Sequence, residues 1–266
     1  MLRNVFLKTL RDQRRALLWW TISALALGLY LALLYPSIAK TPEYNQVIEA
    51  WPKELVVTVL GEFRDYNSPV GFLNSSMFFL CAPVVLLIYA IALGSNAIAG
   101  EEERGTMDLL LSNPLPRWRL VLEKFAALTL LTTALGFALW LGLAIGAVVV
   151  DMDISLGRLA EVTWSGVLLA LAFGTLALAL GCVRGNRGMS VGVASALALA
   201  AYLLNSLAPL TETLKPYRKL SLFYHYIGAD PLANGLNPVH AAVLVGVTVV
   251  LLAVALIAFE RRDVAV

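Results

Sequence analysis

Charged side chains are scarce in this sequence. Asp, Glu, Lys and Arg together make up 14% of its 266 residues, whereas hydrophobic residues make up 59%. Soluble domains carry about 25% charged and about 45–50% apolar residues, so this composition excludes a water-soluble protein, which would need more polar surface. The net charge of +2 is small, and the membrane topology described below accounts for the basic residues. We therefore expect no nucleic-acid partner.

Cysteine and histidine are rare as well, with two of each. Cys81 and Cys182 fall near opposite faces of the predicted membrane domain, on the order of 20 Å apart in depth, which is too far for a disulfide. His225 and His240 have no cysteine or second histidine at ligand spacing, which disfavours a metal site. A phosphate-binding loop ending in Gly-Lys-Ser/Thr is absent, as is a nucleophile beside an obvious base. We expect no catalytic residue, metal site or cofactor in this chain.

Long uncharged apolar runs, in contrast, are plentiful. Six runs of 19 to 26 residues contain no Asp, Glu, Lys or Arg. Each can cross a hydrocarbon layer about 30 Å thick as a helix, whereas a spanning strand needs only about 9–11 residues. The sequence thus predicts an all-α polytopic membrane protein, with a single transmembrane domain over residues 1–266. The six predicted spans are residues 16–35, 77–99, 125–150, 162–183, 188–210 and 241–259.

The basic residues are unequally distributed between the two sides of these spans. With a cytoplasmic N-terminus, thirteen of the twenty Lys and Arg residues lie in cytoplasmic segments. Cytoplasmic loops of membrane proteins carry such an excess, and a basic N-terminus usually sets the orientation. We therefore expect both termini to be cytoplasmic, in the cell (inner) membrane.

The first fifteen residues are basic and amphipathic. Leu2, Val5, Phe6 and Leu10 recur at helical spacing, and basic residues fill the rest of the helical wheel. This pattern predicts a helix that lies in the cytoplasmic interface of the membrane, and a charged extension of the first span is the alternative. A signal peptide is disfavoured because its apolar core has about 7–15 residues, fewer than the first apolar run.

Two longer segments connect spans on the opposite side. In residues 36–73, apolar side chains at helical spacing predict one or two amphipathic interfacial helices, interrupted near Pro52. Residues 211–238 mix aromatic side chains with Gly and Pro. Their length and composition predict a re-entrant element or one that follows the membrane interface.

Residues 100–117 form a charged insertion between the second and third spans, on the predicted cytoplasmic side. The acidic residues 101–103 begin a helical stretch, where the helix dipole favours negative charge. The leucines 109–111 supply apolar surface, and Pro114 and Pro116 end the helix. A short, rigid and charged protrusion of this kind is a poor catalytic site and a good docking surface.

The predicted spans carry no relay of charged groups. Their polar residues are mild ones, such as Thr132, Thr175, Ser195 and Asn205. Pumps driven by protons or sodium normally need an intramembrane carboxylate, so transport by this chain would require energy from elsewhere. The rival hypotheses are a stand-alone secondary transporter and an integral-membrane enzyme. The first would show an intramembrane charge or inverted repeats, and the second a polar catalytic cluster.

The charged segment also carries a family resemblance. Residues 102–117 read Glu-Glu-Arg-Gly-Thr-Met-Asp-Leu-Leu-Leu-Ser-Asn-Pro-Leu-Pro-Arg, and residues 120–124 read Leu-Val-Leu-Glu-Lys. This pattern resembles the signature of ABC-2 type transporter permeases. The resemblance extends along the whole chain, from the basic N-terminus to the Phe-Glu-Arg-Arg-Asp sequence at 259–263.

The resemblance implies the permease subunit of an ATP-driven exporter. In this family two six-helix subunits, identical or different, form the pathway, and two copies of a separate ATPase subunit hold ATP and magnesium. The segment between spans two and three acts as a coupling helix that enters a groove on the ATPase. The residues implied in coupling are Glu101, Glu102, Glu103, Arg104, Gly105, Thr106, Asp108 and Leu109. We further expect Pro83 and Gly94 to form a hinge in the second span.

The spans offer apolar and aromatic surface to a substrate. Trp19, Trp20, Trp140 and Trp164 favour a hydrophobic drug, antibiotic or lipid-like molecule, although Trp at span ends also serves as an interfacial anchor. An ion or a metal-maturation cargo is the alternative, because permeases of this family serve varied cargo.

Overall fold

The computed structural model describes residues 4–41, 48, 50–61, 65–107 and 116–262. Within these ranges every regular element is a helix, and six helical segments are long and apolar enough to cross a membrane. The predicted all-α fold with six spans is therefore confirmed. The six segments are α1 (Val5–Ala39), the interrupted helix Pro69–Ala97, α8 (Arg117–Val149), α9 (Leu156–Arg184), α10 (Arg187–Leu207) with the short helix η2 (Ala208–Leu210), and α13 (Pro238–Arg261).

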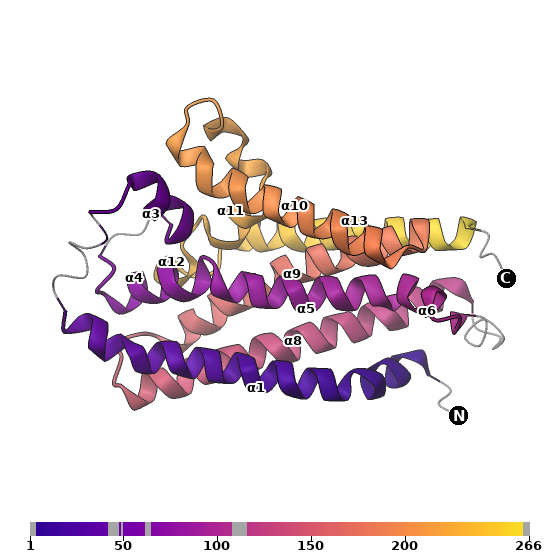
Figure 1. Ribbon diagram of the computed structural model, residues 1–266, viewed down its shortest axis with the longest axis horizontal. Coiled ribbons are helices and arrows are strands. Elements are labelled where there is room, and N and C mark those ends of the chain that lie inside the picture. The colour runs from indigo at the N-terminus through magenta and orange to yellow at the C-terminus, as the bar shows by residue number, and fades with distance from the viewer. Residues whose placement is uncertain (1–3, 42–47, 49, 62–64, 108–115, 263–266) are drawn as a thin grey trace.

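The long helices run side by side in one elongated bundle (Figure 1). α9 lies at its centre, because it packs against α5 (Cys81–Ala97), α8, α10 and α13 and most of its apolar stretch is buried. Both ends of the chain lie at one end of the bundle, together with α6 (Ala99–Glu103) (Figure 1). The N-terminus, the C-terminus and the predicted coupling segment therefore share one side.

Small residues let the central helices approach closely. A Cβ added to Gly94 of α5 would clash with the carbonyl oxygen of Gly174 on α9, and one added to Gly142 of α8 would clash with the carbonyl oxygen of Leu25 on α1. Such close backbone contacts are typical of helix packing in membranes. Gly94, expected as a hinge residue, thus has a packing role at a helix crossing, and its hinge role stays a prediction.

The second span is not one regular helix. It begins with α4 (Pro69–Leu73) and the π-helix η1 (Asn74–Phe78), and α5 starts only at Cys81. The carbonyl oxygen of Phe78, beside this interruption, accepts a hydrogen bond of 2.8 Å from the hydroxyl of Tyr226. Pro83 lies in the first turn of α5, where its missing N–H costs least. The predicted hinge residue thus adjoins an irregular turn, and its motion stays a prediction.

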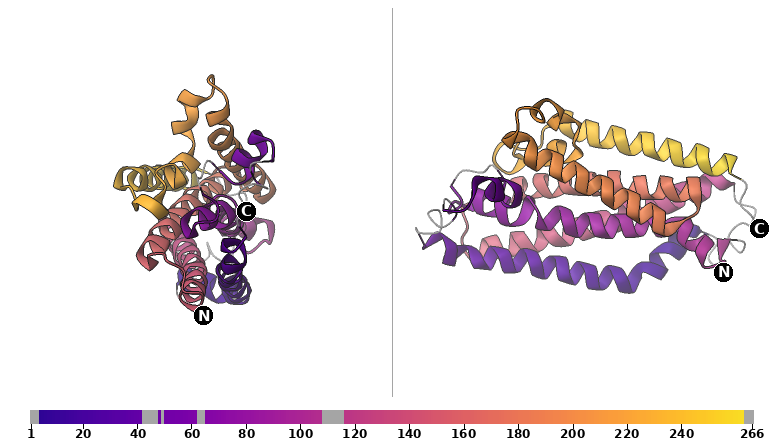
Figure 2. Two further views of the ribbon diagram at one scale, coloured as in Figure 1. Left: turned by 90° about the vertical axis from the view of Figure 1, so that its left-hand side faces the viewer. Right: turned by 45° about the horizontal axis from the view of Figure 1, so that its top comes forward.

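The basic N-terminal segment is not a separate helix. It forms the first turns of α1, which continues without interruption to Ala39, and the predicted position of these turns in the membrane interface stays a prediction. Figure 2 shows these first turns bending away from the axis of the rest of α1. The carboxylate of Glu123 on α8 accepts hydrogen bonds from the N–H groups of Val5 and Phe6, at 2.7 and 3.2 Å. These bonds satisfy helix N-terminal donors and hold the start of α1 against α8.

The segment after α1 contains one of the expected amphipathic helices. α3 (Lys53–Val59) begins directly after Pro52, the residue where an interruption is predicted. It packs on α10, where the hydroxyl of Tyr202 donates a hydrogen bond of 2.5 Å to the carbonyl oxygen of Thr58. Residues 42–47 and 49, where a first helix is also predicted, lie outside the described residues.

The segment between the last two spans folds back onto the bundle. It forms η3 (Lys215–Leu220), α11 (Leu222–Ile227) and α12 (Pro231–Asn234). Tyr226 of α11 is fully buried, and its carbonyl oxygen accepts a hydrogen bond of 2.8 Å from Ser165 of α9. The segment is therefore part of the folded helical core. Its predicted course, into the membrane or along the interface, stays a prediction.

Candidate functional site

The predicted coupling segment begins as a short helix at the end of the second span. α5 ends at Ala97, the backbone departs from helical geometry at Ile98 (φ −116°, ψ −60°), and α6 covers Ala99–Glu103. Gly105 then has a φ of +65°, a left-handed conformation that glycine adopts without strain. This turn ends α6, and the next residues return to the bundle, where Thr106 hydrogen-bonds to Glu101 and Met107 is buried. Of the predicted coupling residues, the structure does not describe Asp108 and Leu109, which lie within the undescribed range 108–115.

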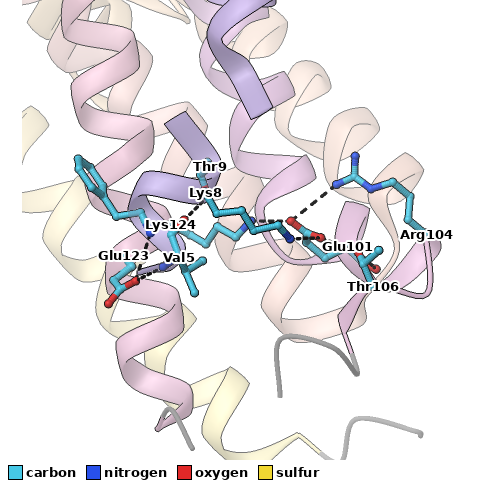
Figure 3. Close-up of polar contacts among 9 residues, drawn as sticks. Val5, Lys8, Thr9, Glu101, Arg104, Thr106, Glu123 and Lys124 are labelled. Carbon is cyan, nitrogen blue, oxygen red and sulfur yellow. Dashed lines mark hydrogen bonds and ion pairs between the residues drawn. The ribbon is translucent and has the colours of Figure 1, made fainter. Parts of the chain in front are cut away.

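Glu101 lies at the centre of a buried ion-pair cluster. Its side chain and that of Lys124 on α8 are 7% and 4% exposed, and Lys124 Nζ donates a hydrogen bond of 2.7 Å to Glu101 Oε1. The hydroxyl of Thr106 donates to Glu101 Oε2 at 2.5 Å, and Nζ of Lys8 on α1 lies 3.7 Å from the same oxygen. Figure 3 shows these three groups converging on the Glu101 carboxylate. The cluster therefore connects α1, α6 and α8 at one point.

The cluster keeps Glu101 ionised although the group is buried. Burial by itself disfavours the carboxylate, but the charge and hydrogen bond of Lys124, the Thr106 hydroxyl and the charge of Lys8 outweigh it and lower the pKa of Glu101 from 4.5 to about 2. A buried ion pair is tolerated when its geometry is good and further hydrogen bonds complete it. The Lys124 and Thr106 contacts meet both conditions.

This pKa predicts a specific loss of stability in acid. The folded-state pKa of Glu101, about 2, lies below its ordinary value of 4.5, so the unfolded chain binds the proton more tightly. The stabilisation of the folded chain by the ionised Glu101 carboxylate is complete above about pH 4.5, and it is lost as the pH falls from there through the folded-state pKa. Melting temperatures in detergent between pH 7 and pH 3 should therefore fall more steeply for the wild type than for Glu101→Gln. Parallel curves for the two proteins would contradict the assignment.

Glu102 is held by the C-terminal end of α13. Nη2 and Nη1 of Arg262 lie 2.7 and 3.0 Å from Glu102 Oε2 and Oε1, a two-bond pairing of the kind that guanidinium and carboxylate groups favour. Arg262 Nη1 also contacts the carbonyl oxygen of Cys182 on α9 at 3.4 Å. Arg117, at the start of α8, donates a hydrogen bond of 2.5 Å to the carbonyl oxygen of Arg262. These contacts attach α6 to the start of α8 and to the C-terminal ends of α9 and α13, all of which are predicted to face the cytoplasm.

Glu103, Arg104 and Gly105 are the exposed part of the segment. Glu103 accepts a hydrogen bond of 3.1 Å from the N–H of Arg187, the first residue of α10. The Arg104 side chain is 59% exposed and its Nη2 lies 3.9 Å from Glu101 Oε1, a separation at which an exposed ion pair contributes little. These three residues form the surface of α6 and its turn that another protein can reach.

The three glutamates, all expected to face a partner, thus divide by environment. Glu101 faces inward, Glu102 faces the chain terminus and Glu103 faces solvent. Sequence reasoning missed the cluster partners Lys8, Lys124, Glu123 and Arg262. Lys124 was visible as the charged residue next to the third apolar run, directly after Glu123, at a place where a charge is costly unless paired.

An apolar groove lies between α5 and α10. It has a volume of about 410 Å³, within the range of small-molecule sites. Its lining includes Pro83, Val84, Leu87, Ile88, Tyr202 and Phe223. Arg187, at the start of α10, is the charged residue of its lining, so the groove suits a mostly apolar molecule.

Comparison with known proteins agrees with the resemblance to ABC-2 type transporter permeases. The model of a family described as "ABC-2 family transporter protein" matches residues 3–264. The chain is 36% identical over 151 residues to the probable ABC transporter permease protein NosY of Pseudomonas aeruginosa, a match over 55% of this chain and 53% of that protein. The match therefore spans about half the length of this curated relative. With the family model matching nearly its full length and six helices able to cross a membrane, the chain belongs to the ABC-2 family of transporter proteins and is a multi-pass membrane permease.

Proposed function

We propose that this chain forms the translocation pathway of an ATP-driven exporter, as a dimer of permease subunits coupled to two separate ATPase subunits. The observation that carries the proposal is the network around α6. It joins an exposed charged turn to α1 and α8 through Glu101, and to α9 and α13 through Glu102. ATP and magnesium are held by the partner subunit, and hydrolysis takes place there.

The network suits the transmission of force. α6 covers five residues and is fixed on two sides by charge-assisted hydrogen bonds of 2.7 Å, so the segment moves with the helices it contacts rather than by itself. An ATPase that binds Glu103 and Arg104 would displace α6 when it closes around ATP. The displacement reaches four membrane helices and tilts them as rigid bodies between inward-open and outward-open states.

The groove between α5 and α10 supports an apolar substrate. Its lining is almost entirely hydrophobic, and two of the lining side chains, Ile88 and Leu199, are exposed. A hydrophobic drug, antibiotic or lipid-like molecule matches this surface, because the removal of apolar area from water favours binding. An ion cargo would need more polar groups than this groove provides.

The docking proposal is tested by capture of an ABC ATPase subunit, sought by its phosphate-binding loop among the neighbouring reading frames. Purified wild-type permease should retain that subunit, and Arg104→Glu should weaken retention at least tenfold, because it reverses the charge of an exposed side chain of the turn. Arg15→Glu, which reverses an exposed charge on α1, is the matched control and should leave retention unchanged. Equal retention by Arg104→Glu and the wild type would reject the turn as the docking surface.

A further inference from the structure

The only two histidines of the sequence meet in the folded chain. His225 lies on α11 and His240 in the first turn of α13, fifteen positions apart, yet their ring centroids are 5.0 Å apart with an interplanar angle of 83°. Tyr224 lies 5.3 Å from each ring. α11 and the start of α13 lie toward the end of the bundle away from α6 (Figure 1). This histidine cluster is therefore separate from the coupling segment.

Hydrogen bonding fixes the protonation pattern of His225. Its Nε2 lies 3.0 Å from the carbonyl oxygen of Lys219, and because a carbonyl oxygen can only accept, Nε2 carries the hydrogen. In the neutral imidazole the Nδ1 atom is then an acceptor with a bare lone pair. It is screened from solvent and has no hydrogen-bond partner among the described residues. A buried acceptor without a partner is rare in proteins, and a bound ion is one of the groups that can satisfy it.

This arrangement is that of a metal-binding histidine. Histidines that bind metals through one ring nitrogen almost always donate the other N–H to a carboxylate or a backbone carbonyl, which sets the tautomer and the ring orientation. Lys219 supplies that carbonyl for His225. The conformation of α11 and η3 therefore holds the ring ready for an ion before any ion binds.

The spacing of the two rings matches joint coordination. A metal–nitrogen bond of about 2.0–2.1 Å places a metal about 3.1 Å from each ring centroid, and two rings at a tetrahedral angle are then about 5.1 Å apart. The observed separation is 5.0 Å.

We propose that His225 and His240 bind a divalent first-row transition-metal ion. Imidazole nitrogen is a preferred ligand of copper, nickel and zinc, and copper forms the tightest complexes of that series. Among the described residues no group of three or more His, Cys, Asp or Glu side chains lies close enough to form a closed metal site. The two imidazoles are therefore the protein ligands of the proposed site, and the remaining coordination positions are left to ligands from outside the chain. The site does not depend on ATPase coupling.

The test measures Cu²⁺ binding to the full-length permease in detergent. The protein is purified through an affinity tag that contains no histidine, so the tag itself does not bind the ion. Titration calorimetry should give one ion per chain, and electron paramagnetic resonance should show hyperfine coupling to two imidazole nitrogens. His225→Gln and His240→Gln should each weaken binding by about tenfold or more, because each removes one ligand.

Matched variants separate this site from other donors. Glu212→Gln, in an exposed position of the same connecting segment, and Cys81→Ser, which removes the partly accessible thiol, should both bind Cu²⁺ as the wild type does. The electron paramagnetic resonance spectrum is recorded on the wild-type protein. It therefore shows whether two imidazole nitrogens bind the ion even if a histidine substitution disturbs folding. Absence of stoichiometric binding, a signal without nitrogen coupling, or unchanged affinity in both histidine variants would overturn the proposal.

Discussion

Glu101→Ala is expected to destabilise the folded permease by about 3–5 kcal/mol, the cost of removing one partner of a buried ion pair. The substitution leaves Lys124, whose side chain is 4% exposed, without the carboxylate that compensates its charge. It also removes the acceptor of the Thr106 hydroxyl and the partner of Lys8. Unfolding in mixed micelles, followed by circular dichroism, measures the difference in the free energy of unfolding.

Two comparisons show whether this effect comes from the pair. Glu103→Ala removes an exposed carboxylate from the same helix and should change stability by no more than about 0.5–1 kcal/mol. The double variant Glu101→Met with Lys124→Met replaces both charges by apolar side chains of similar length. It should recover most of the lost stability, because replacing a complete buried pair is often neutral. A double variant as unstable as Glu101→Ala would show that the ion pair is not the cause.

The six spans could be predicted because membrane burial acts on long uniform stretches. Uncharged runs of about 20 residues have few alternatives to a spanning helix, whatever their neighbours are. The helices extend beyond the apolar runs at several ends. α8, for example, begins at Arg117, eight residues before the predicted third span, because polar residues outside the hydrocarbon continue the same hydrogen-bonded helix.

The inward direction of Glu101 could not be predicted in the same way. Its partners Lys8 and Lys124 lie on other helices, and Glu102 pairs with Arg262 across 160 positions. α6 covers five residues, fewer than two turns, so its sequence has no periodicity that separates a buried face from an exposed one. Tertiary contacts alone decide which of three consecutive glutamates turns inward. The same limit applies to the histidine cluster, whose rings meet only because α11 folds back onto α13.

Gly105→Pro is expected to reduce transport, and the stimulation of ATPase activity by substrate, by at least about tenfold while the protein still folds. Gly105 has a φ of +65°, whereas proline fixes φ near −65° and lacks the N–H that now donates to the carbonyl oxygen of Glu102 at 2.9 Å. Proline also disfavours the helical conformation of Arg104, the residue before it. The exposed turn would therefore change direction, and the ATPase would bind a displaced Arg104. Substrate uptake into inverted vesicles that contain the permease and its ATPase measures the effect.

Gly105→Ala isolates the contribution of backbone conformation. A Cβ at this position meets no atom within 4 Å, so alanine adds no clash and only the strain of a positive φ, on the order of 1 kcal/mol. Its transport should lie between that of the wild type and Gly105→Pro. Gly192→Ala, inside α10 and also without neighbours within 4 Å, should transport normally, since alanine favours helix. If Gly105→Pro transported as well as Gly192→Ala, the direction of this turn would have no part in coupling, and the force would have to enter the bundle elsewhere.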